Sequence, residues 1–424
     1  MKIWVWRDCE PLPIDLNKPR LMRAGMLCAA LAARGHEVRW FNSTFNHYQK
    51  SFRAQAPGSY RLDDGTLVEL VAGLGYLSNG APRRLLHNAL VARRFVRRAR
   101  ELARVETERP DIIVADLPMP DSALAAVRLA RDWSIPSVVS VRDLWPDFFA
   151  SFLSPAKALV ARPLIANLDR MVRAACSEAH HLVGISQGYL DWALDKAGRE
   201  QGLGDCVAPL GYAPEPVAAQ GNSRASLEGK GVDLDKKLAT FIGSWGRTYD
   251  LKILLEAARR LQDENDLQFV IAGKGEQGAQ FEAAAAKLRN VVLPGWLNRS
   301  EIAFLLENST IALAPYSQAA PQGLPNKLFE YLAAGLFQVS TLRSEAKTVL
   351  EQSGGGMVVP GGDPAAFAAG ICRALEVGGD PAAKQAIKNY FAEYFVASKV
   401  YNDYVSKLEE FAVGRTGGNR CWSG

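Results

Sequence analysis

Residues 321–335 read PQGLPNKLFEYLAAG, a loop containing glycine and proline that leads directly into an apolar helical pattern. The first backbone N–H groups of such a helix have no partner within the helix, and they carry the positive end of its dipole. A phosphate or diphosphate is therefore a natural ligand for this segment. Lys327 adds a positive charge in the first turn, and Glu330 follows three positions later on the same helix face. Because a carboxylate repels phosphate, we expect Glu330 to bind a sugar or ribose hydroxyl, and a plain surface ion pair with Lys327 is the alternative.

Short apolar segments alternate with helical patterns on both sides of this loop. After residue 236 we predict strands at 238–242, 267–272, 291–294, 311–315 and 337–341, and helices at 251–262, 281–288, 301–307 and 327–334. Before residue 213 we predict strands at 2–6, 37–41, 111–115, 137–141 and 182–185, and helices at 21–34, 84–105 and 121–132. Apolar strands without polar alternation are typical of parallel sheets covered on both faces, and strand–helix alternation favours a doubly wound α/β fold.

The pattern occurs twice, which predicts two domains. A chain of 424 residues suits two domains, and residues 212–236 are rich in glycine and proline but lack an apolar period, as a linker would. We therefore expect an N-terminal Rossmann-like domain at 1–213 and a C-terminal one at 214–397, facing each other across a cleft. We expect a final helix at about 398–424 to pack back on the first domain.

Composition narrows the class of protein. The chain is 48% hydrophobic and 22% charged, as globular proteins are, and no segment approaches ~18 uninterrupted apolar residues, so we expect no membrane span. The six cysteines form no CxxC pair and no histidine stands at ligand spacing, so we expect no metal site.

The two halves of the chain differ in charge. Residues 1–200 hold 28 Lys and Arg against 21 Asp and Glu, and residues 201–424 hold 22 Lys and Arg against 24 Asp and Glu. The basic first half lacks a nucleic-acid recognition motif, so we expect no nucleic-acid partner.

In these segments the sequence resembles the retaining glycosyltransferases of the GT-B fold, family 4. The similarity extends over nearly the whole chain, through LAARGHEV at 31–38, FIGSWGR at 241–247, IAGKGE at 271–276, VLPGW at 292–296 and GGMVVP at 355–360. The loop at 321–335 looks like the branch that builds bacterial cell-surface polysaccharides, including lipopolysaccharide. The resemblance implies transfer of a hexose-type sugar, with retained anomeric configuration, from a UDP- or GDP-linked donor to a hydroxyl of a polyprenyl-diphosphate-linked or oligosaccharide acceptor. It also implies that the protein needs no metal or other cofactor.

The resemblance further implies roles for individual residues. Glu330 matches the glutamate that binds the nucleotide ribose, while Arg247 and Lys327 would stabilise the departing diphosphate. The implied donor-binding set is Gly246, Arg247, Gln322, Gly323, Leu324, Asn326, Lys327 and Glu330.

Three positions depart from the pattern of the family. The first of its two glutamates falls at Gln322, and the glycine pair that follows the first strand reads as Lys18-Pro19. The lysine that usually accompanies the arginine at Arg247 reads as Tyr249 or Asp250. Lys327 is our candidate to replace the lost charge.

Residues 141–147, VRDLWPD, close the strand predicted at 137–141. Asp143 stands where many relatives have a histidine near the reacting sugar. A carboxylate at the carboxyl end of a strand can accept the proton of the acceptor or orient its hydroxyl, and a loop-capping aspartate is the alternative. We therefore expect Asp143, Arg247 and Lys327 to be the catalytic residues.

The helix predicted at 84–105 has a strongly basic face. Four of its arginines are our candidates for contact with an anionic membrane surface or with the acceptor: Arg93, Arg94, Arg97 and Arg98. An ordinary solvated face is the alternative. We expect a cytoplasmic protein, with peripheral attachment to the inner face of the cell membrane as an option.

Two other functions fit the same observations. A sugar-nucleotide epimerase of the same fold would bind the same nucleotide without needing an acceptor. A non-catalytic scaffold in a polysaccharide assembly complex would explain Gln322 and the missing glycine pair.

Overall fold

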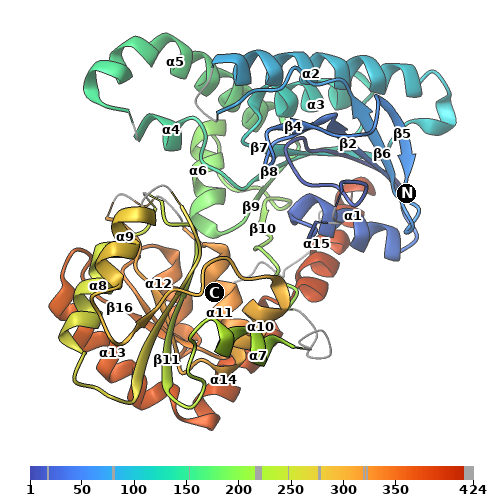
Figure 1. Ribbon diagram of the computed structural model, residues 1–424. Coiled ribbons are helices and arrows are strands. Elements are labelled where there is room, and N and C mark those ends of the chain that lie inside the picture. Colours follow the sequence, from blue (N-terminus) through green and yellow to red (C-terminus); the bar gives the residue numbers. More distant parts are fainter. Residues whose placement is uncertain are drawn as a thin grey trace. The chain divides into compact units, whose positions relative to one another are not determined.

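The computed structural model describes residues 1–16, 19–78, 82–151, 153–214, 222–246, 248–275, 278–318, 320 and 323–414. The chain forms two compact units (Figure 1). Unit 1 comprises Met1–Leu210 together with Ala397–Gly424, and unit 2 comprises Gly211–Val396. The two chain connections between the units run side by side, because Tyr212 forms a parallel bridge with Val396 and its N–H donates to the carbonyl of Phe395 at 3.0 Å.

Unit 1 is built on an eight-stranded sheet in the order β10-β9-β8-β7-β1-β2-β6-β5. The strands pair in parallel except for β5, which runs antiparallel to β6. The strands of this sheet are β1 (Lys2–Trp6), β2 (Glu37–Ser43), β5 (Gly58–Arg61), β6 (Leu67–Val71), β7 (Ile112–Leu117), β8 (Ser137–Val141), β9 (His181–Gly184) and β10 (Cys206–Val207). A separate hairpin pairs β3 (Phe45–Asn46) with β4 (Ser51–Phe52).

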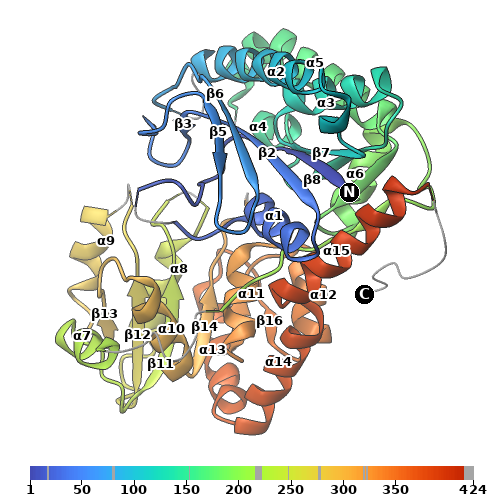
Figure 2. The ribbon, with the colours of Figure 1, turned by 90° about the vertical axis from the view of Figure 1, so that its right-hand side faces the viewer.

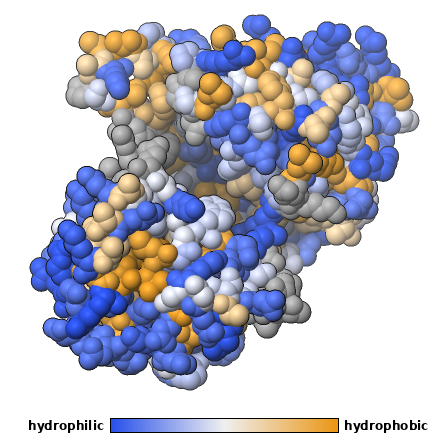
Figure 3. Space-filling model, in the orientation of Figure 1, coloured by the Kyte–Doolittle hydropathy of each residue, from blue (hydrophilic) through white to orange (hydrophobic). Residues whose placement is uncertain are grey.

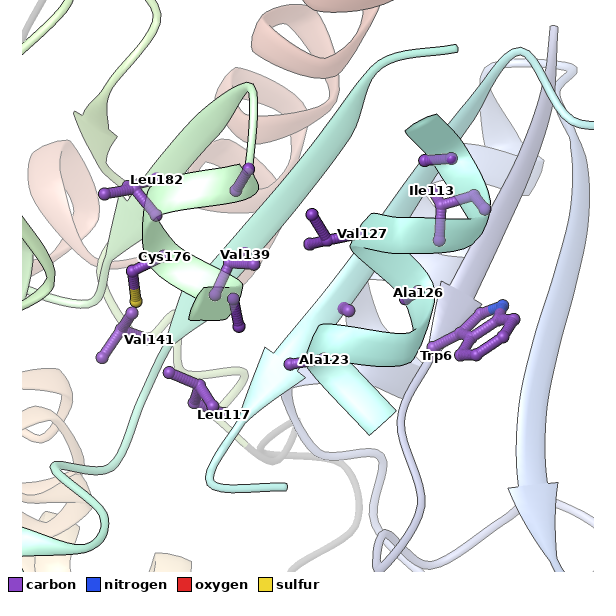
Figure 4. Packing of buried hydrophobic residues seen from close by; sticks show 14 of the residues in the cluster. Trp6, Ile113, Leu117, Ala123, Ala126, Val127, Val139, Val141, Cys176 and Leu182 are labelled. Atoms are coloured by element: carbon purple, nitrogen blue, oxygen red, sulfur yellow. The ribbon is translucent and has the colours of Figure 1, made fainter. Parts of the chain in front are cut away.

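Helices cover both faces of this sheet, which explains why its strands are apolar without alternation. The helices of unit 1 are α1 (Arg23–Ala33), α2 (Pro82–Leu102), α3 (Pro120–Asp132), α4 (Asp147–Ser151), α5 (Pro155–Glu178), α6 (Gln187–Ala197) and α15 (Ala397–Ala412), with a 3₁₀ turn at Glu106–Glu108. One face packs against α2, α3, α5 and α6, and Figure 4 shows Ala123, Ala126 and Val127 of α3 seated on the strands there. The other face packs against α1 and α15, which lie against each other (Figure 2).

Strand β1 shows how one segment serves both cores. Trp4 and Trp6 belong to the core under α2 and α3, whereas Ile3 and Val5 belong to the core under α1 and α15. This is the two-residue period of a strand, with all four of these side chains buried. The Trp6 ring contacts Phe95 of α2 edge to face at 5.5 Å between ring centres.

Helix α15 returns from unit 2 to unit 1 and is held to α1 by charged groups. Arg34 donates to Glu409 at 2.7 Å and to Ser406 Oγ at 2.8 Å, and His36 Nε2 lies 2.9 Å from the Glu409 carboxylate. The buried side of α15 adds Tyr401, Tyr404 and other apolar residues to the core of unit 1.

Unit 2 is a six-stranded, entirely parallel sheet in the order β13-β12-β11-β14-β15-β16. Its strands are β11 (Lys237–Ile242), β12 (Leu267–Ala272), β13 (Val291–Val292), β14 (Ile311–Ala314), β15 (Phe337–Ser340) and β16 (Gly356–Val358). Its helices are α7 (Ser223–Gly229), α8 (Leu251–Arg260), α9 (Gly278–Ala285), α10 (Arg299–Asn308), α11 (Asn326–Ala333), α12 (Glu345–Gln352), α13 (Pro364–Gly378) and α14 (Pro381–Tyr394).

Each sheet contains a point at which the strand order reverses. In unit 1 the chain goes from β1 to β2 on one side and later places β7 on the other side of β1. In unit 2 it goes from β11 to β12 and later places β14 on the other side of β11. Ligands of open α/β sheets bind at the carboxyl ends of the strands at such reversals. The two loops that follow β1 and β11 are therefore the places to look for a site.

Candidate functional site

The reversal in unit 2 is shaped by two closely packed glycines. Gly243 follows β11 and Gly273 follows β12, and Gly273 has a φ of +142°. A Cβ atom on Gly273 would lie 1.8 Å from the carbonyl oxygen of Gly243, so only glycine fits there. The Gly273 N–H donates to the carbonyl of Gly295, which follows β13, at 2.9 Å. The backbones at the carboxyl ends of β11 and β12 therefore pack against each other more closely than any residue with a side chain would allow.

Helix α11 begins beside this surface. The position of a Cβ on Gly243 would be 3.4 Å from Cε of Lys327, so the lysine stem lies against the end of β11. Lys327 Nζ lies 3.1 Å from the carboxylate of Glu330, and both side chains are less than one-fifth exposed. The residue before the helix, Pro325, gives its first turn no side-chain cap. The positive end of the helix, a lysine and a carboxylate therefore meet at the strand reversal.

The loop leading into α11 is anchored to the next helix. The carbonyl of Gly323 accepts hydrogen bonds from Ser344 Oγ at 2.7 Å and from the N–H of Ala346 at 3.2 Å. Leu324 is buried. These contacts fix the path of the backbone at Gly323 and Leu324, the segment that the sequence predicts to approach the donor. Gln322 and Arg247, two other residues of that prediction, lie outside the described residues.

Three aromatic side chains pack together at the ends of β11 and β14. Tyr249 packs edge to face on Phe241 at 5.0 Å and against Tyr316 at 4.9 Å between ring centres. Burial raises the pKa of Tyr249, and the nearby negative charge of Glu330 raises it further, which places Glu330 close to this ring. The adjacent Asp250 caps α8 by accepting the N–H of Ile253. Tyr249 and Asp250 therefore have structural roles at the position where the sequence resemblance led us to expect a lysine.

The reversal in unit 1 holds a buried network of charged side chains. Arg142, after β8, pairs with Glu10, after β1, and with Asp116 of β7, the latter at 3.2 Å. Glu10 also accepts the N–H of Ala24 at 3.0 Å, in the first turn of α1. Burial alone would raise the pKa of Glu10, but the charges of Arg142 and Arg7 together lower it. Glu10 is therefore ionised at neutral pH although its side chain is buried.

A second buried pair lies beside this network. Asp8 Oδ2 lies 3.0 Å from Nε2 of His87, and neither side chain is exposed. His87 Nδ1 accepts the N–H groups of Leu74 and Gly75, each at 3.1 Å, so the ring proton must be on Nε2 and must point to Asp8. The pair therefore fixes the loop after β6 to the end of β1.

Asp143 follows Arg142 at the same edge of the sheet, as the sequence predicts. Burial raises its pKa, and the charges of Arg7, Arg142 and Arg84 oppose that rise. A carboxyl group with a raised pKa is a better proton acceptor than an ordinary aspartate.

Sequence reasoning missed most of this edge of unit 1. Arg7, Asp8 and Glu10 directly follow an apolar strand, and charged residues at that position were the available signal. His87 gave no signal, because it stands inside a helix and its hydrogen-bond partners come from two other segments.

The arginines of α2 differ in their surroundings. Arg94 donates to the carbonyl of Ala72, and Arg98 pairs with Glu69 at 3.0 Å and donates to Ser59 Oγ at 2.8 Å. These two arginines therefore tie α2 to β5 and β6. Arg93 and Arg97 are exposed, and Arg97 pairs with Glu101 at 2.9 Å.

The described residues can also be assessed for a metal site and for a membrane-spanning helix. They contain no group of three or more His, Cys, Asp or Glu side chains that could hold a metal ion. No helix among them is both long and apolar enough to cross a membrane.

Comparisons with known proteins match both units. Residues 22–202 match the family described as glycosyl transferase 4-like domain, and residues 236–377 match the family described as glycosyl transferases group 1. A stretch of 130 residues is 33% identical to the amylovoran biosynthesis glycosyltransferase AmsK of Erwinia amylovora. That stretch spans 29% of this chain and 32% of AmsK, so it covers about a third of that relative.

Two solved structures resemble the whole chain. Sucrose-phosphate synthase from Thermosynechococcus elongatus superposes with a TM-score of 0.70 at 15% identity, covering 97% of this chain and 99% of that one. Anabaena Alr3699/HepE, solved in complex with UDP, superposes with a TM-score of 0.64 at 14% identity, covering 97% of this chain and 100% of that one. The likeness confirms the two-domain α/β fold that the sequence predicts.

Proposed function

We propose, on the premise that the chain carries both domains of a GT-B glycosyltransferase, that it transfers a sugar from a nucleoside diphosphate to a hydroxyl group with retention of configuration. The observation that carries the proposal is the start of α11 at the strand reversal of unit 2. There Lys327 and Glu330 lie 3.1 Å apart, and the lysine stem lies against Gly243 at the end of β11. A helix N-terminus with a lysine suits a diphosphate, and the carboxylate suits the ribose hydroxyls of the same nucleotide.

Unit 2 is the proposed donor-binding unit. Lys327 and the first N–H groups of α11 would stabilise the charge that develops on the departing diphosphate. The fixed backbone at Gly323 and Leu324 would position the sugar, with Gly246, Arg247, Gln322 and Asn326 completing the set. UDP or GDP is the proposed nucleotide, and we propose that these protein groups stabilise the charge without a metal.

Unit 1 is the proposed acceptor-binding unit. Asp143 would orient the hydroxyl of the acceptor or accept its proton, and its raised pKa supports the second role. We propose a saccharide or lipid-linked acceptor in bacterial surface polysaccharide synthesis, in the cytoplasm. The partial identity to AmsK, which is named for amylovoran biosynthesis, supports a role in polysaccharide synthesis.

The first experiment is thermal unfolding with UDP, GDP, ADP, CMP and dTDP, each with and without EDTA. A ligand at ~100 times its dissociation constant adds about 2.7 kcal/mol, which a melting curve resolves. We expect one nucleoside diphosphate to stabilise the protein equally with EDTA. Stabilisation that disappears with EDTA would refute the proposal that binding needs no metal. A lack of stabilisation by every nucleotide at millimolar concentration would refute the proposed donor site.

A second experiment separates transfer from epimerisation. The protein is incubated with the identified nucleotide sugar alone and then with a lipid-linked saccharide, and the anomeric signal of the product is followed by NMR. We expect an acceptor-dependent product of the same anomeric configuration as the donor. Conversion of the donor sugar without acceptor would instead indicate the epimerase.

We also propose peripheral contact with an anionic membrane through the helix layer of α2, α3 and α5. Arg93 and Arg97 are exposed on α2, and Leu159 and Val160 of α5 are 70% and 81% exposed. Figure 3 shows apolar atoms gathered over that part of α5. Vesicles containing phosphatidylglycerol should sediment the protein at low salt, and Arg93→Gln/Arg97→Gln should weaken the binding. Equal sedimentation with neutral phosphatidylcholine vesicles would contradict this proposal.

A further inference from the structure

Cationic and aromatic side chains gather at the carboxyl edge of unit 1, near Asp143, and no role has yet been given to them. Lys50, from the β3–β4 hairpin, lies with its Nζ 4.9 Å from the ring centre of Tyr76. Arg84, in the first turn of α2, lies with its Cζ 5.8 Å from the same ring and 5.1 Å from that of Trp145. Two cations from separate segments therefore flank one tyrosine.

Arg7 supplies a third cation to this edge, and its hydrogen bonding is incomplete. The side chain is only 7% exposed, and its Nε and Nη1 atoms are buried without a hydrogen-bond partner among the described residues. Its Nε lies 3.6 Å from Glu10 and 4.0 Å from Asp116, but Arg142 takes both carboxylates at closer range. A buried guanidinium with unused N–H groups is unfavourable until an acceptor of hydrogen bonds arrives. Its planar fork suits an oxyanion.

The charges of Lys50, Arg84 and Arg7 all act on one histidine, His47. The pKa of His47 is lowered to about 4, first by burial and then by the charges of Lys50, Arg84 and Arg7. The pKa of Lys50 is lowered by burial and by the charge of Arg84. The cations therefore repel one another, and a bound anion would relieve the repulsion.

We propose that Arg7, Lys50 and Arg84 form a subsite for an oxyanion carried by the acceptor. The inference rests on the proposed function, because it assigns a group of the acceptor to unit 1. Such an oxyanion can come from the diphosphate of a lipid carrier or from the carboxylate of an acidic sugar. Exposed apolar side chains adjoin the subsite in sequence, with Phe52 at 58% and Leu77 at 88%, and they suit the first of these sources.

The subsite is tested by calorimetric titration of sodium pyrophosphate into the full chain, with and without saturating UDP. The variant is Lys50→Gln/Arg84→Gln, whose half-buried side chains can be exchanged without opening the core. The matched control is Arg109→Gln, an exposed arginine of the same unit. We expect the double variant to weaken pyrophosphate binding by about tenfold or more, equivalent to about 1.4 kcal/mol, and the control to leave it unchanged.

Two further titrations distinguish the sources of the anion. Geranylgeranyl diphosphate in detergent represents the lipid carrier, and glucuronate represents an acidic sugar. Binding of only one of them, lost in Lys50→Gln/Arg84→Gln, identifies the source.

The titrations also separate this inference from the proposed function. If UDP fails to bind while pyrophosphate binding still depends on Lys50 and Arg84, the donor site is refuted and the subsite is not. Pyrophosphate affinity that is the same in the double variant and in the wild type would overturn the subsite, whatever UDP does.

Discussion

Replacing Arg142 with methionine tests the buried charge network of unit 1. The arginine pairs with Glu10 and with Asp116, whose side chains are buried. Removing one partner of a buried ion pair typically costs about 3–5 kcal/mol, because the remaining charge loses its compensation. Arg7 stays within 4.0 Å of both carboxylates and can compensate in part, so we expect a loss near the lower end, about 3 kcal/mol.

The effect should depend on pH in a defined direction. The folded pKa of Glu10 is below its ordinary value of 4.5, so its charge stabilises the wild type above that value, and this contribution is lost as the pH falls through the lower folded pKa. In Arg142→Met, only Arg7 and the N–H groups at the start of α1 oppose the effect of burial, so the pKa of Glu10 rises, and protonation of Glu10 reduces the destabilisation of the variant. The stability difference between the two proteins should therefore be largest at neutral pH and should shrink as the pH falls toward 4.

Urea unfolding at pH 7.5 and at pH 4, followed by tryptophan fluorescence, measures both effects. Glu10→Gln and the double variant Glu10→Gln/Arg142→Met complete a thermodynamic cycle. We expect the double variant to lose less stability than the two single variants together, by about 1–2 kcal/mol. A loss below about 1 kcal/mol in Arg142→Met, or a difference that does not change with pH, would refute the account of this network.

Three further predictions concern the sites of both units. Lys327→Met should weaken UDP binding by about tenfold but leave uridine binding unchanged, because the lysine is assigned to the diphosphate. Glu330→Ala should weaken the binding of both ligands, because the carboxylate is assigned to the ribose. Calorimetry with UDP and with uridine checks both expectations. Gly273→Ala should destabilise the protein by more than about 3 kcal/mol in thermal unfolding, since its Cβ would meet the Gly243 carbonyl, while Gly229→Ala, which meets nothing within 4 Å, should stay within about 0.5 kcal/mol. Asp143→Asn should abolish the acidic limb of the turnover profile, which in the wild type should lie above the ordinary aspartate pKa of 3.8; a limb that persists in the variant belongs to another group.

The sequence predicted the parallel strands well because each is a continuous apolar run. The predicted ranges 137–141 and 267–272 coincide with β8 (Ser137–Val141) and β12 (Leu267–Ala272). The antiparallel edge strand β5 (Gly58–Arg61) was not predicted, because its residues are half exposed and form no apolar run. Helix α5 was also missed, since its first half is exposed and has no clear apolar face.

The two candidate sites were not equally visible in the sequence. The loop and helix at 321–335 are contiguous, so the i,i+3 spacing alone brought Lys327 and Glu330 together, as the structure shows at 3.1 Å. The network of Arg142, Glu10 and Asp116 joins residues as much as 132 positions apart, and only the order of strands in the sheet makes them neighbours. A sequence without a sheet order cannot indicate such a cluster.

The two strand reversals differ in the chemical groups that line them, and the pH dependence of ligand binding should differ with them. At the end of β11 two closely packed glycines, Gly243 and Gly273, lie beside a helix N-terminus and the Lys327–Glu330 pair. At the end of β1 the corresponding place is filled by charged side chains, whose ionisation depends on their mutual distances. Backbone dipoles do not titrate, whereas the pKa of Lys50 and that of Asp143 are both shifted toward neutrality. Binding in unit 2 should therefore change little with pH, and binding in unit 1 should carry most of the pH dependence of the protein.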